Sequence, residues 1–470
     1  MMGTAQRVLS RSSLWQNVCS HCQLLHKALP PLWVSARGSK NWKKKIDKRE
    51  DIKDTVVEYV GQNPRRADRV YAWGCATTGA LGIASYLRPE QKQKPIRRQL
   101  RPARVKFIDA NHIRPYFVSC GYGFTVYAVK SSRGLEIFGT GMNTNSQLGY
   151  HEVPRNSGRV LDYIIEPVEI YLPVEKPHAT RVRHIGCGRA HTVIITEGAG
   201  VFSLGNNAYG QCGRPIVEGE NFSKSPLVNT VHDLPDNVEK VVCGQDHTIF
   251  ITQSGQLLAC GMGADGQTGQ GHYDLISTPT HLGGDVEGEK IVQVHGRGDC
   301  VLAVSDKGDV FGWGNSEYSQ LALVTDHTQM STPRHLPFDT CGRVVKAVAG
   351  GSICALLNDK GQVFVWGYGI LGKGPALESS NVPTMIPETL FGRNELQADS
   401  KVVDIDCGLG HFVAVTDQGD VYSWGHNRHG CLGLGSSDNQ FFPLKVSVPA
   451  ETHTALCGVD HTIALCKSFT

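Results

Sequence analysis

The chain has 470 residues, of which 40% are apolar and 19% are charged, with a formal net charge of +3. That length accommodates a large core, as two or three ordinary domains or as one repeat architecture, and 53 glycines favour tight turns between short strands. The near-balanced charge excludes a chain that binds polyanions over its whole surface, and the absence of an apolar run of about eighteen residues argues against a membrane-spanning helix.

The N-terminal segment, residues 1–46, differs in composition from the rest of the chain. It contains no Asp or Glu and carries eight basic residues, namely Arg7, Arg11, Lys27, Arg37, Lys40, Lys43, Lys44 and Lys45. This composition is typical of a mitochondrial transit peptide, with a disordered basic tail as the alternative. We expect a cleaved, disordered leader at 1–46 and a lead-in segment at 47–68. Without those eight charges the body has 39 basic and 44 acidic residues, so any contact with nucleic acid must be local.

A basic segment, residues 88–106, reads RPEQKQKPIRRQLRPARVK and holds eight basic residues against a single acid, Glu90. It lies in one of the longest intervals between repeated motifs, so we expect a loop. Such a loop can track RNA phosphates, and a GTPase surface or acidic lipid headgroups fit the same charge. A solvated, flexible loop is the alternative. The candidate residues for binding a polyanion or a partner are Arg97, Arg98, Arg101, Arg104 and Lys106.

A short motif recurs seven times along the chain, 53 to 66 residues apart. Its copies are VYAWG ending at Gly74, LEIFG at Gly139, VFSLG at Gly205, LLACG at Gly261, VFGWG at Gly314, VFVWG at Gly367 and VYSWG at Gly425. Most copies follow a turn that ends in glycine, such as TQSG or NDKG, and before the turn lies a second strand that begins with Cys-Gly. HGRGDC and AGGSIC are degenerate copies of that start. The repeating unit is therefore a β-hairpin followed by a Gly-rich loop.

Alternation within the motif indicates how the units pack. Phe364 and Trp366, and likewise Tyr422 and Trp424, fall on one face of their strands, and the residue between them is often small in other copies. Sheets that stack like wedges about an axis need one bulky face and one small face, which is propeller geometry.

The two ends of the chain each hold half a hairpin. RVYAWG lacks a preceding Cys-Gly strand, and CGVDHTIAL, near the C-terminus, lacks a following Trp-Gly strand. Pairing these halves completes a seventh blade and removes two exposed sheet edges. We predict an all-β, seven-bladed propeller over residues 69–470, closed by pairing of the N- and C-terminal strands. An open solenoid is the alternative.

Two apparent binding motifs fall inside the repeat. Gly261, Gly263 and Gly266 have G-x-G-x-x-G spacing, but no amphipathic helix follows them, as a dinucleotide site requires, so these glycines are assigned to turns. The Cys-x3-His pairs, such as Cys243 with His247, have the residue types of a metal site. His247 shares its strand face with apolar residues, so we expect buried histidines with one hydrogen bond each.

The fifteen cysteines do not indicate a disulfide framework. Their number is odd, and many precede Gly inside apolar strands, which favours buried thiols in a reducing compartment. Cys19 and Cys22 form a C-x-x-C pair within the expected leader, where a redox role has little support.

The repeats CGRAHTVIITEGAGVFSLGNNAYGQCG and CGLGHFVAVTDQGDVYSWGHNRHGCLG resemble the regulator of chromosome condensation family over about residues 60–470. The resemblance implies a seven-bladed propeller. The founding nuclear member is a guanine-nucleotide exchange factor for the Ran GTPase, whereas many other members are interaction platforms. The wedge that the founding member inserts into its GTPase has no match in this sequence.

Phrases such as FGWGNSEYSQLA, together with the leader, resemble a mitochondrial member of the family. That resemblance implies a location in the matrix or on the matrix face of the inner membrane, with peripheral membrane association. It also implies exchange activity on the dynamin-like GTPase of inner-membrane fusion, and support of large ribosomal RNA and mitochondrial ribosome assembly. A pure protein–protein scaffold is the alternative. No catalytic motif stands outside the repeats, so we expect neither covalent catalysis nor a cofactor.

Overall fold

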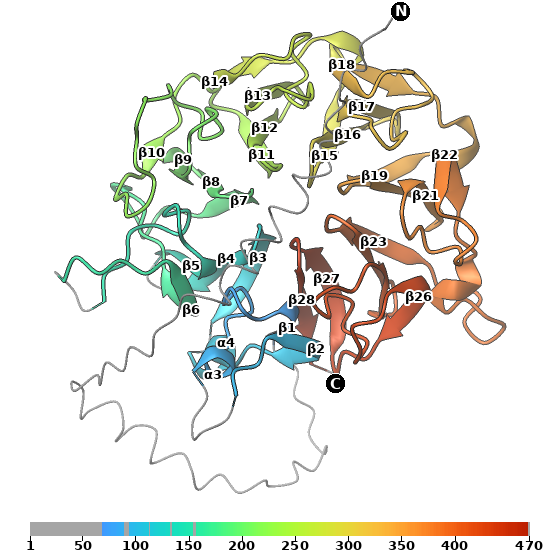
Figure 1. Cartoon of the computed structure of the whole chain (residues 1–470), viewed down its shortest axis with the longest axis horizontal. Coiled ribbons are helices and arrows are strands. Elements are labelled where there is room, and N and C mark those ends of the chain that lie inside the picture. Colours follow the sequence, from blue (N-terminus) through green and yellow to red (C-terminus); the bar gives the residue numbers. More distant parts are fainter. Residues whose placement is uncertain (1–67, 89–93, 112, 132–133, 154–156, 469–470) are drawn as a thin grey trace, which may run out of the picture. The chain divides into compact units, whose positions relative to one another are not determined.

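The computed structural model describes residues 68–88, 94–111, 113–131, 134–153 and 157–468. Within these residues the chain forms seven four-stranded sheets, which follow one another around a central axis as the blades of a propeller (Figure 1). The predicted fold class is therefore confirmed. The expected leader at 1–46 lies outside the described residues, as does the lead-in segment apart from Asp68.

Each blade is an antiparallel meander whose first strand lies nearest the axis. Blade 1 comprises β3 (Arg114–Cys120), β4 (Phe124–Ser131), β5 (Gly134–Met142) and β6 (Tyr163–Glu169). Blade 2 comprises β7 (Val182–Cys187), β8 (His191–Thr196), β9 (Gly200–Gly205) and β10 (Asn229–Thr230). Blade 3 comprises β11 (Val238–Cys243), β12 (His247–Thr252), β13 (Leu257–Gly261) and β14 (Ile276–His281).

Blades 4, 5 and 6 repeat this order. Blade 4 comprises β15 (Ile291–His295), β16 (Cys300–Ser305), β17 (Val310–Asn315) and β18 (Gln329–Leu336). Blade 5 comprises β19 (Val344–Ala349), β20 (Ile353–Asn358), β21 (Val363–Tyr368) and β22 (Ser379–Met385). Blade 6 comprises β23 (Val402–Cys407), β24 (His411–Thr416), β25 (Val421–Gly425) and β26 (Gln440–Val446). Short helices occupy connections: α3 (Ala84–Leu87), α4 (Lys106–Ala110), and the 3-10 turns η1 (Gly284–Val286), η2 (Asp339–Cys341) and η3 (Glu388–Phe391).

Blade 7 is built from both ends of the propeller. It contains β27 (Glu451–Cys457) and β28 (His461–Lys467), followed outward by β1 (Asp68–Cys75) and β2 (Arg98–Arg104). β1 and β28 run antiparallel, with Trp73 opposite Thr462 (Figure 1). Closure by the terminal strands is therefore confirmed, and it pairs the two strands that a linear array would leave as open edges.

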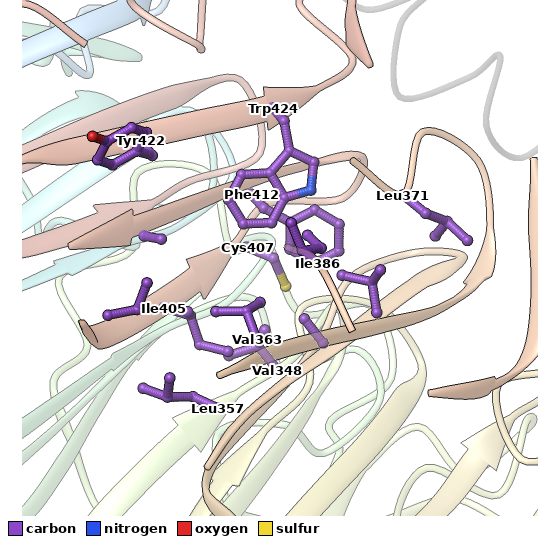
Figure 2. Close-up of a cluster of buried hydrophobic side chains, with 14 of the residues drawn as sticks. Val348, Leu357, Val363, Leu371, Ile386, Ile405, Cys407, Phe412, Tyr422 and Trp424 are labelled. Atoms are coloured by element: carbon purple, nitrogen blue, oxygen red, sulfur yellow. The ribbon is translucent and has the colours of Figure 1, made fainter. Parts of the chain in front are cut away.

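The core lies between blades, as the alternation in the motif predicts. Phe364 and Trp366 of β21 pack against blade 4, whereas Val365 between them packs against blade 6. Figure 2 shows the layer between blades 5 and 6, where Phe412 and Trp424 stack with their ring centroids 5.1 Å apart. At this interface the aromatic face of β25 is buried against smaller side chains of blade 5, so the two blades hold one another in place through apolar burial.

Indole N–H groups add polar contacts between neighbouring blades. Trp73 donates to the Cys431 carbonyl at 2.8 Å, Trp313 to the Gln267 carbonyl at 3.0 Å, and Trp366 to the Gln320 carbonyl at 2.8 Å. Each acceptor lies in the loop before the outermost strand of the preceding blade. The Trp-Gly copies therefore position those loops as well as filling the core.

The outermost strands are poor templates for a further strand. Six of them carry a proline, namely Pro102, Pro167, Pro279, Pro333, Pro383 and Pro443, and the seventh, β10, is two residues long. The register of these strands is also irregular, for example between the Ala259–Thr280 and Gly261–Ile276 pairs. Because proline lacks a backbone donor, strand addition at the rim is disfavoured, and partners are expected at loops instead.

Candidate partner-binding surface

The Cys-Gly-x-x-His segments are packing units. A Cβ on Gly244 would lie 2.0 Å from the Cε1 atom of His247, so this position needs glycine to make room for the imidazole. Burial lowers the pKa of His247 to about 4 and that of His191 to about 3, so both rings are neutral at physiological pH. Neutral rings enclosed within the sheets have a structural role.

The expectation of one hydrogen bond for each histidine is correct at two positions. His191 Nε2 donates to Thr248 Oγ1 at 3.0 Å, and His461 Nε2 contacts Thr125 Oγ1 at 2.9 Å, each threonine belonging to the next blade. It is wrong for His247, whose two ring nitrogens have no partner among the described residues. The reason is that blade 4 has Val301 at the position where blade 3 has Thr248 and blade 1 has Thr125.

The described cysteines are free thiols and all thirteen are buried. Burial raises the pKa of Cys187 and of Cys212 to about 12, so the reactive thiolate is scarce at neutral pH. In the described part of the chain, no group of three His, Cys, Asp or Glu side chains is arranged to hold a metal ion. These side chains serve packing.

The glycine-rich signature forms a turn. Gly261 has a φ of +116°, and a Cβ there would lie 2.5 Å from the Asp246 carbonyl oxygen. Residues 262–275, all of which are described, contain no helix and lead into β14. The helix N-terminus that would receive a pyrophosphate is therefore missing from this segment, in agreement with the assignment made from the sequence.

Where the structure describes it, at residues 88 and 94–106, the basic segment is not the loop that its sequence predicted. Arg98, Arg101 and Arg104 lie on β2, which pairs with β1, and Lys106 is the first residue of α4. Pairing with β1 places these side chains, together with Arg97, on the exposed rim of blade 7. This correction follows from ring closure, because β1 needs an outer partner and this segment is the next one along the chain.

The charges of this rim are partly neutralised. Arg104 forms an ion pair with Asp109, which also pairs with Arg69 at 3.4 Å. Within the described ranges, no carboxylate pairs with Arg97, Arg98 or Arg101. Those three exposed guanidinium groups therefore remain available to phosphates or to an acidic partner.

The propeller has two unlike faces. We call one the loop face; it carries the connections from first to second and from third to fourth strands. We call the other the turn face. On the loop face, the longest connections between third and fourth strands are residues 76–97, 143–162 and 206–228, in the adjacent blades 7, 1 and 2. The corresponding connections in blades 3 to 6 are shorter, residues 262–275, 316–328, 369–378 and 426–439.

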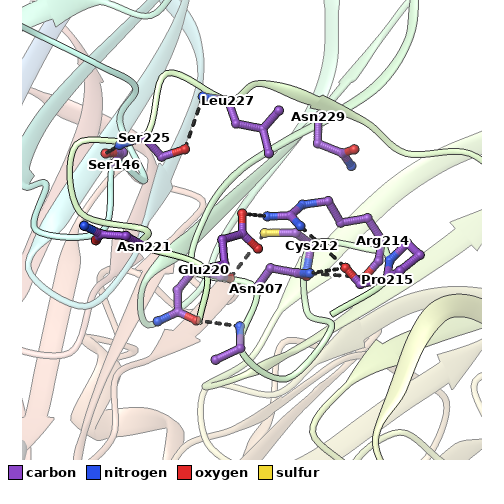
Figure 3. Close-up of polar contacts among 12 residues, drawn as sticks. Ser146, Asn207, Cys212, Arg214, Pro215, Glu220, Asn221, Ser225, Leu227 and Asn229 are labelled. Atoms are coloured by element: carbon purple, nitrogen blue, oxygen red, sulfur yellow. Dashed lines mark hydrogen bonds and ion pairs between the residues drawn. The ribbon is translucent and has the colours of Figure 1, made fainter. Parts of the chain in front are cut away.

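The connection 206–228 has a rigid base (Figure 3). The Asn207 side-chain amide donates to the carbonyls of Arg214 and Pro215 at 3.1 and 3.2 Å, and its oxygen accepts the Cys212 N–H at 3.0 Å. Arg214 forms a largely buried ion pair with Glu220. Such bonds fix the backbone on either side of the tip, so the order of this loop does not depend on a partner.

Two contacts join this connection to the one in blade 1. Ser225 donates its backbone N–H to Ser146 Oγ at 2.9 Å, and Asn206 donates from Nδ2 to Asn145 Oδ1 at 3.1 Å. We call the joined pair, residues 143–153, 157–162 and 206–228, the paired-loop surface.

The paired-loop surface exposes apolar side chains. Val217 is 57% and Val153 56% exposed, and Tyr150, Ile216 and Leu227 are also exposed. Ordered loops that leave large apolar side chains in water are typical of protein-binding sites. This surface was not predicted from the sequence. The signal present in the sequence was the length of the intervals between motifs, which was applied only to the basic segment.

The chain matches known proteins along most of its length. The regulator of chromosome condensation (RCC1) repeat matches residues 67–128, 199–251, 307–357, 360–415 and 418–465. The human RCC1-like G exchanging factor-like protein is 46% identical over 442 residues, covering 93% of this chain and 94% of that protein.

Two solved structures are similar. The crystal structure of human WBSCR16 is 48% identical, with a TM-score of 0.80, and the match covers 86% of this chain and all of that one. Prp20p from Saccharomyces cerevisiae, a structure reported with its binding properties to Gsp1p and histones, is 18% identical with a TM-score of 0.69; it covers 86% of this chain and 92% of that one. At that identity the second match supports the fold alone. The matched repeats and the human relative show that this chain belongs to the regulator of chromosome condensation (RCC1) repeat family.

Proposed function

We propose that this protein is a non-enzymatic mitochondrial interaction platform whose paired-loop surface binds a GTPase and promotes its guanine-nucleotide exchange. The observation that carries the proposal is the ordered pair of long loops, which hold exposed apolar residues such as Val153 and Val217 in place. The name of the human relative, an exchanging-factor-like protein, supports the same activity.

Exchange on this surface needs no nucleophile and no acid–base pair. An exchange factor accelerates nucleotide release by binding the nucleotide-free state of the GTPase more tightly than the nucleotide-bound state. A surface already ordered by Asn207 and by the Arg214–Glu220 pair loses little conformational entropy on binding, so more of its contact energy is available for that discrimination.

The proposed partners follow from the leader, the resemblance and the charges. The leader composition supports a location in the mitochondrial matrix or on the matrix face of the inner membrane. The resemblance supports the dynamin-like fusion GTPase of that membrane and the mitochondrial large ribosomal RNA as partners. The exposed arginines of β2 suit the phosphates of that RNA and of its assembly complexes. Among the described residues, no helix is both long and apolar enough to cross a bilayer. Membrane association in this proposal is peripheral.

Changing Arg97, Arg98, Arg101 and Arg104 together to Glu should abolish RNA association. The substitution replaces four positive charges by four negative ones, three of them on β2 and the fourth at Arg97 just before it. The slope of log Kobs against the logarithm of salt concentration should therefore become less steep by about 3. Crosslinking and filter binding to the large ribosomal RNA measure the effect, and circular dichroism checks the fold because Arg104 pairs with Asp109.

A matched control carries the same charge change on exposed residues of the turn-face side, namely Arg181, Lys290, Lys360 and Lys401. This control should bind RNA far more tightly than the β2 variant and about as tightly as the unmodified chain. RNA crosslinking that survives in the β2 variant would show that β2 is not the contact.

Capture of the mature protein from mitochondrial lysate separates the two activities from a pure scaffold. Samples are split between nuclease treatment and excess GDP, and bound RNA and proteins are identified in each. Loss of a GTPase with GDP alone supports exchange, and loss of ribosomal RNA and its proteins with nuclease supports the assembly role. Partners that resist both treatments would favour a pure protein–protein scaffold.

A further inference from the structure

The central channel of the propeller contains a cavity of about 520 Å³ lined by the innermost strands of all seven blades. Its walls follow β3, β7, β11, β15, β19, β23 and β27, which Figure 1 shows around the axis. The volume falls within the range of small-molecule sites in proteins, and a propeller axis is a common place for such sites.

Arg297 lies at the loop-face end of the channel, just after β15. It belongs to blade 4, yet its guanidinium donates to the Cys120 carbonyl of blade 1 and to the Cys457 carbonyl of blade 7, both at 2.7 Å. The Tyr122 hydroxyl donates to the Arg297 carbonyl at 2.8 Å. The arginine therefore joins blade 4 to blades 1 and 7 across the ring.

The floor of the cavity carries a second contact across the ring. His295 Nε2 of blade 4 lies 3.0 Å from Asp406 Oδ1 of blade 6, and Asp406 Oδ2 accepts the Cys457 N–H at 2.8 Å. Burial would raise the pKa of Asp406, but the hydrogen bond with His295 and the nearby charge of Arg297 lower it. Asp406 is therefore an anion whose negative charge is already stabilised by groups of the protein. Arg297 Nε, in contrast, is buried without a partner in the described residues.

The mouth is a ring of seven residues that occupy the same register position in their blades. They are Phe117, His184, Lys240, Gln293, Lys346, Asp404 and Thr454, each the first paired residue after the irregularity in its inner strand. All seven are partly exposed to the channel. The position recurs in every blade, and in this chain its charged residues are two lysines, Lys240 and Lys346, and one carboxylate, Asp404.

The two lysines of the mouth differ in their partners. Lys346 lies 2.6 Å from Asp404 and is neutralised by it. Lys240 donates to the Val292 carbonyl at 2.9 Å, and no carboxylate of the described chain pairs with it. Lys240 is thus a cation at the rim of a cavity, held by one neutral acceptor.

The cavity lining has a net positive charge. Lys240, Lys346 and Arg297 oppose Asp404 and Asp406, which leaves 3 − 2 = +1. The histidines add nothing at neutral pH, because burial lowers the pKa values of His184, to about 4, and of His295 and His453. A single negative charge would balance the lining.

We propose that the channel binds a small molecule with one anionic group, a carboxylate or a phosphate monoester, whose charged end lies against Lys240 and whose body fills the cavity beside Phe117. This site goes beyond the proposed exchange and assembly roles and faces away from the paired-loop surface, so a ligand there does not compete with the GTPase.

Isothermal titration of the full chain with benzoate and with phenyl phosphate tests the site, with benzyl alcohol as the neutral probe. Both anions should bind saturably and benzyl alcohol should not. Lys240→Gln should weaken anion binding at least about tenfold, because it removes one charge-assisted hydrogen bond. Lys360→Gln, on the exposed turn after β20, should leave the affinity unchanged.

A second variant excludes the other basic surface. Combined Arg97→Gln, Arg98→Gln and Arg101→Gln should not change anion binding, and a crystal soaked with phenyl phosphate should show its phosphate near Lys240. Absence of saturable binding by either anion would overturn the proposal. Three other results would overturn it: equal binding of benzyl alcohol, an affinity for anions unaffected by Lys240→Gln, or loss of anion binding in the triple Arg→Gln variant.

Discussion

Replacing Trp73 by alanine should lower the free energy of unfolding by about 4 kcal/mol. Trp73 is fully buried in β1 and packs at the seam between blades 6 and 7 with Val421, Val446 and Ala464. Its indole N–H also donates to the Cys431 carbonyl. The substitution leaves a large cavity beside the one blade that joins the two ends of the propeller, and urea unfolding followed by fluorescence and circular dichroism measures the loss.

A pair of phenylalanine variants separates packing from hydrogen bonding. Trp73→Phe removes the bond to Cys431, whereas Trp424→Phe removes no bond, because the Trp424 indole N–H has no partner in the described part of the chain. Trp73→Phe should therefore cost about 1 kcal/mol more. A loss below about 1 kcal/mol for Trp73→Ala would mean that this seam does not hold the ring closed.

Replacing Arg297 by methionine should destabilise the protein by about 3 kcal/mol. The change keeps the aliphatic stem but leaves the carbonyls of Cys120 and Cys457 without their donor and takes a positive charge away from Asp406. Because Cys120 and Cys457 belong to blades across the ring from Arg297, the loss of stability measures how much contacts across the channel stabilise the whole propeller. Urea unfolding measures it.

Two further variants test whether the loss of stability comes from the two hydrogen bonds that Arg297 makes across the channel. Arg297→Lys keeps the charge but cannot donate to two carbonyls through a fork, so its loss should be intermediate. Arg189→Met removes an ion pair with Asp246 between adjacent blades and should cost less than Arg297→Met. Equal stability of Arg297→Met and the unmodified chain would show that the bonds across the channel do not contribute.

Repetition made much of the fold predictable. The spacing of the Trp-Gly copies predicted the number of blades, and the half-hairpins at the two ends predicted the pairing of β1 with β28. Local sterics also follow from sequence, because Gly244 lies only three positions before His247, the first residue of β12. Features of this kind depend on residues close in the chain or on a pattern repeated along it.

Contacts across the ring were not predictable in the same way. Arg297 lies in a degenerate copy of the motif, and its partners are 177 and 160 positions away in the chain. Nothing in the local sequence indicates that the ring brings them within 2.7 Å. The missing partner of His247 likewise depends on Val301 in the neighbouring blade.

The candidate site was only partly predictable. The charges of β2 were evident from composition, but their placement on a strand depends on pairing with β1. The paired-loop surface depends on contacts between loops of two blades, such as Ser225 with Ser146, and the variable loops carry no repeat pattern that would indicate them. The loops of a propeller determine which partners it binds, and these loops are the part of the structure that the sequence predicts least well.

The most direct test of the proposed function is the rate at which labelled GDP leaves the dynamin-like GTPase of the mitochondrial inner membrane. The unmodified protein should accelerate release. A variant with Ile216→Asp and Val217→Asp, both exposed at the tip of the 206–228 connection, should keep its stability and lose at least about tenfold in acceleration. A release rate unchanged by the unmodified protein, or equally accelerated by the variant, would contradict exchange through the paired-loop surface.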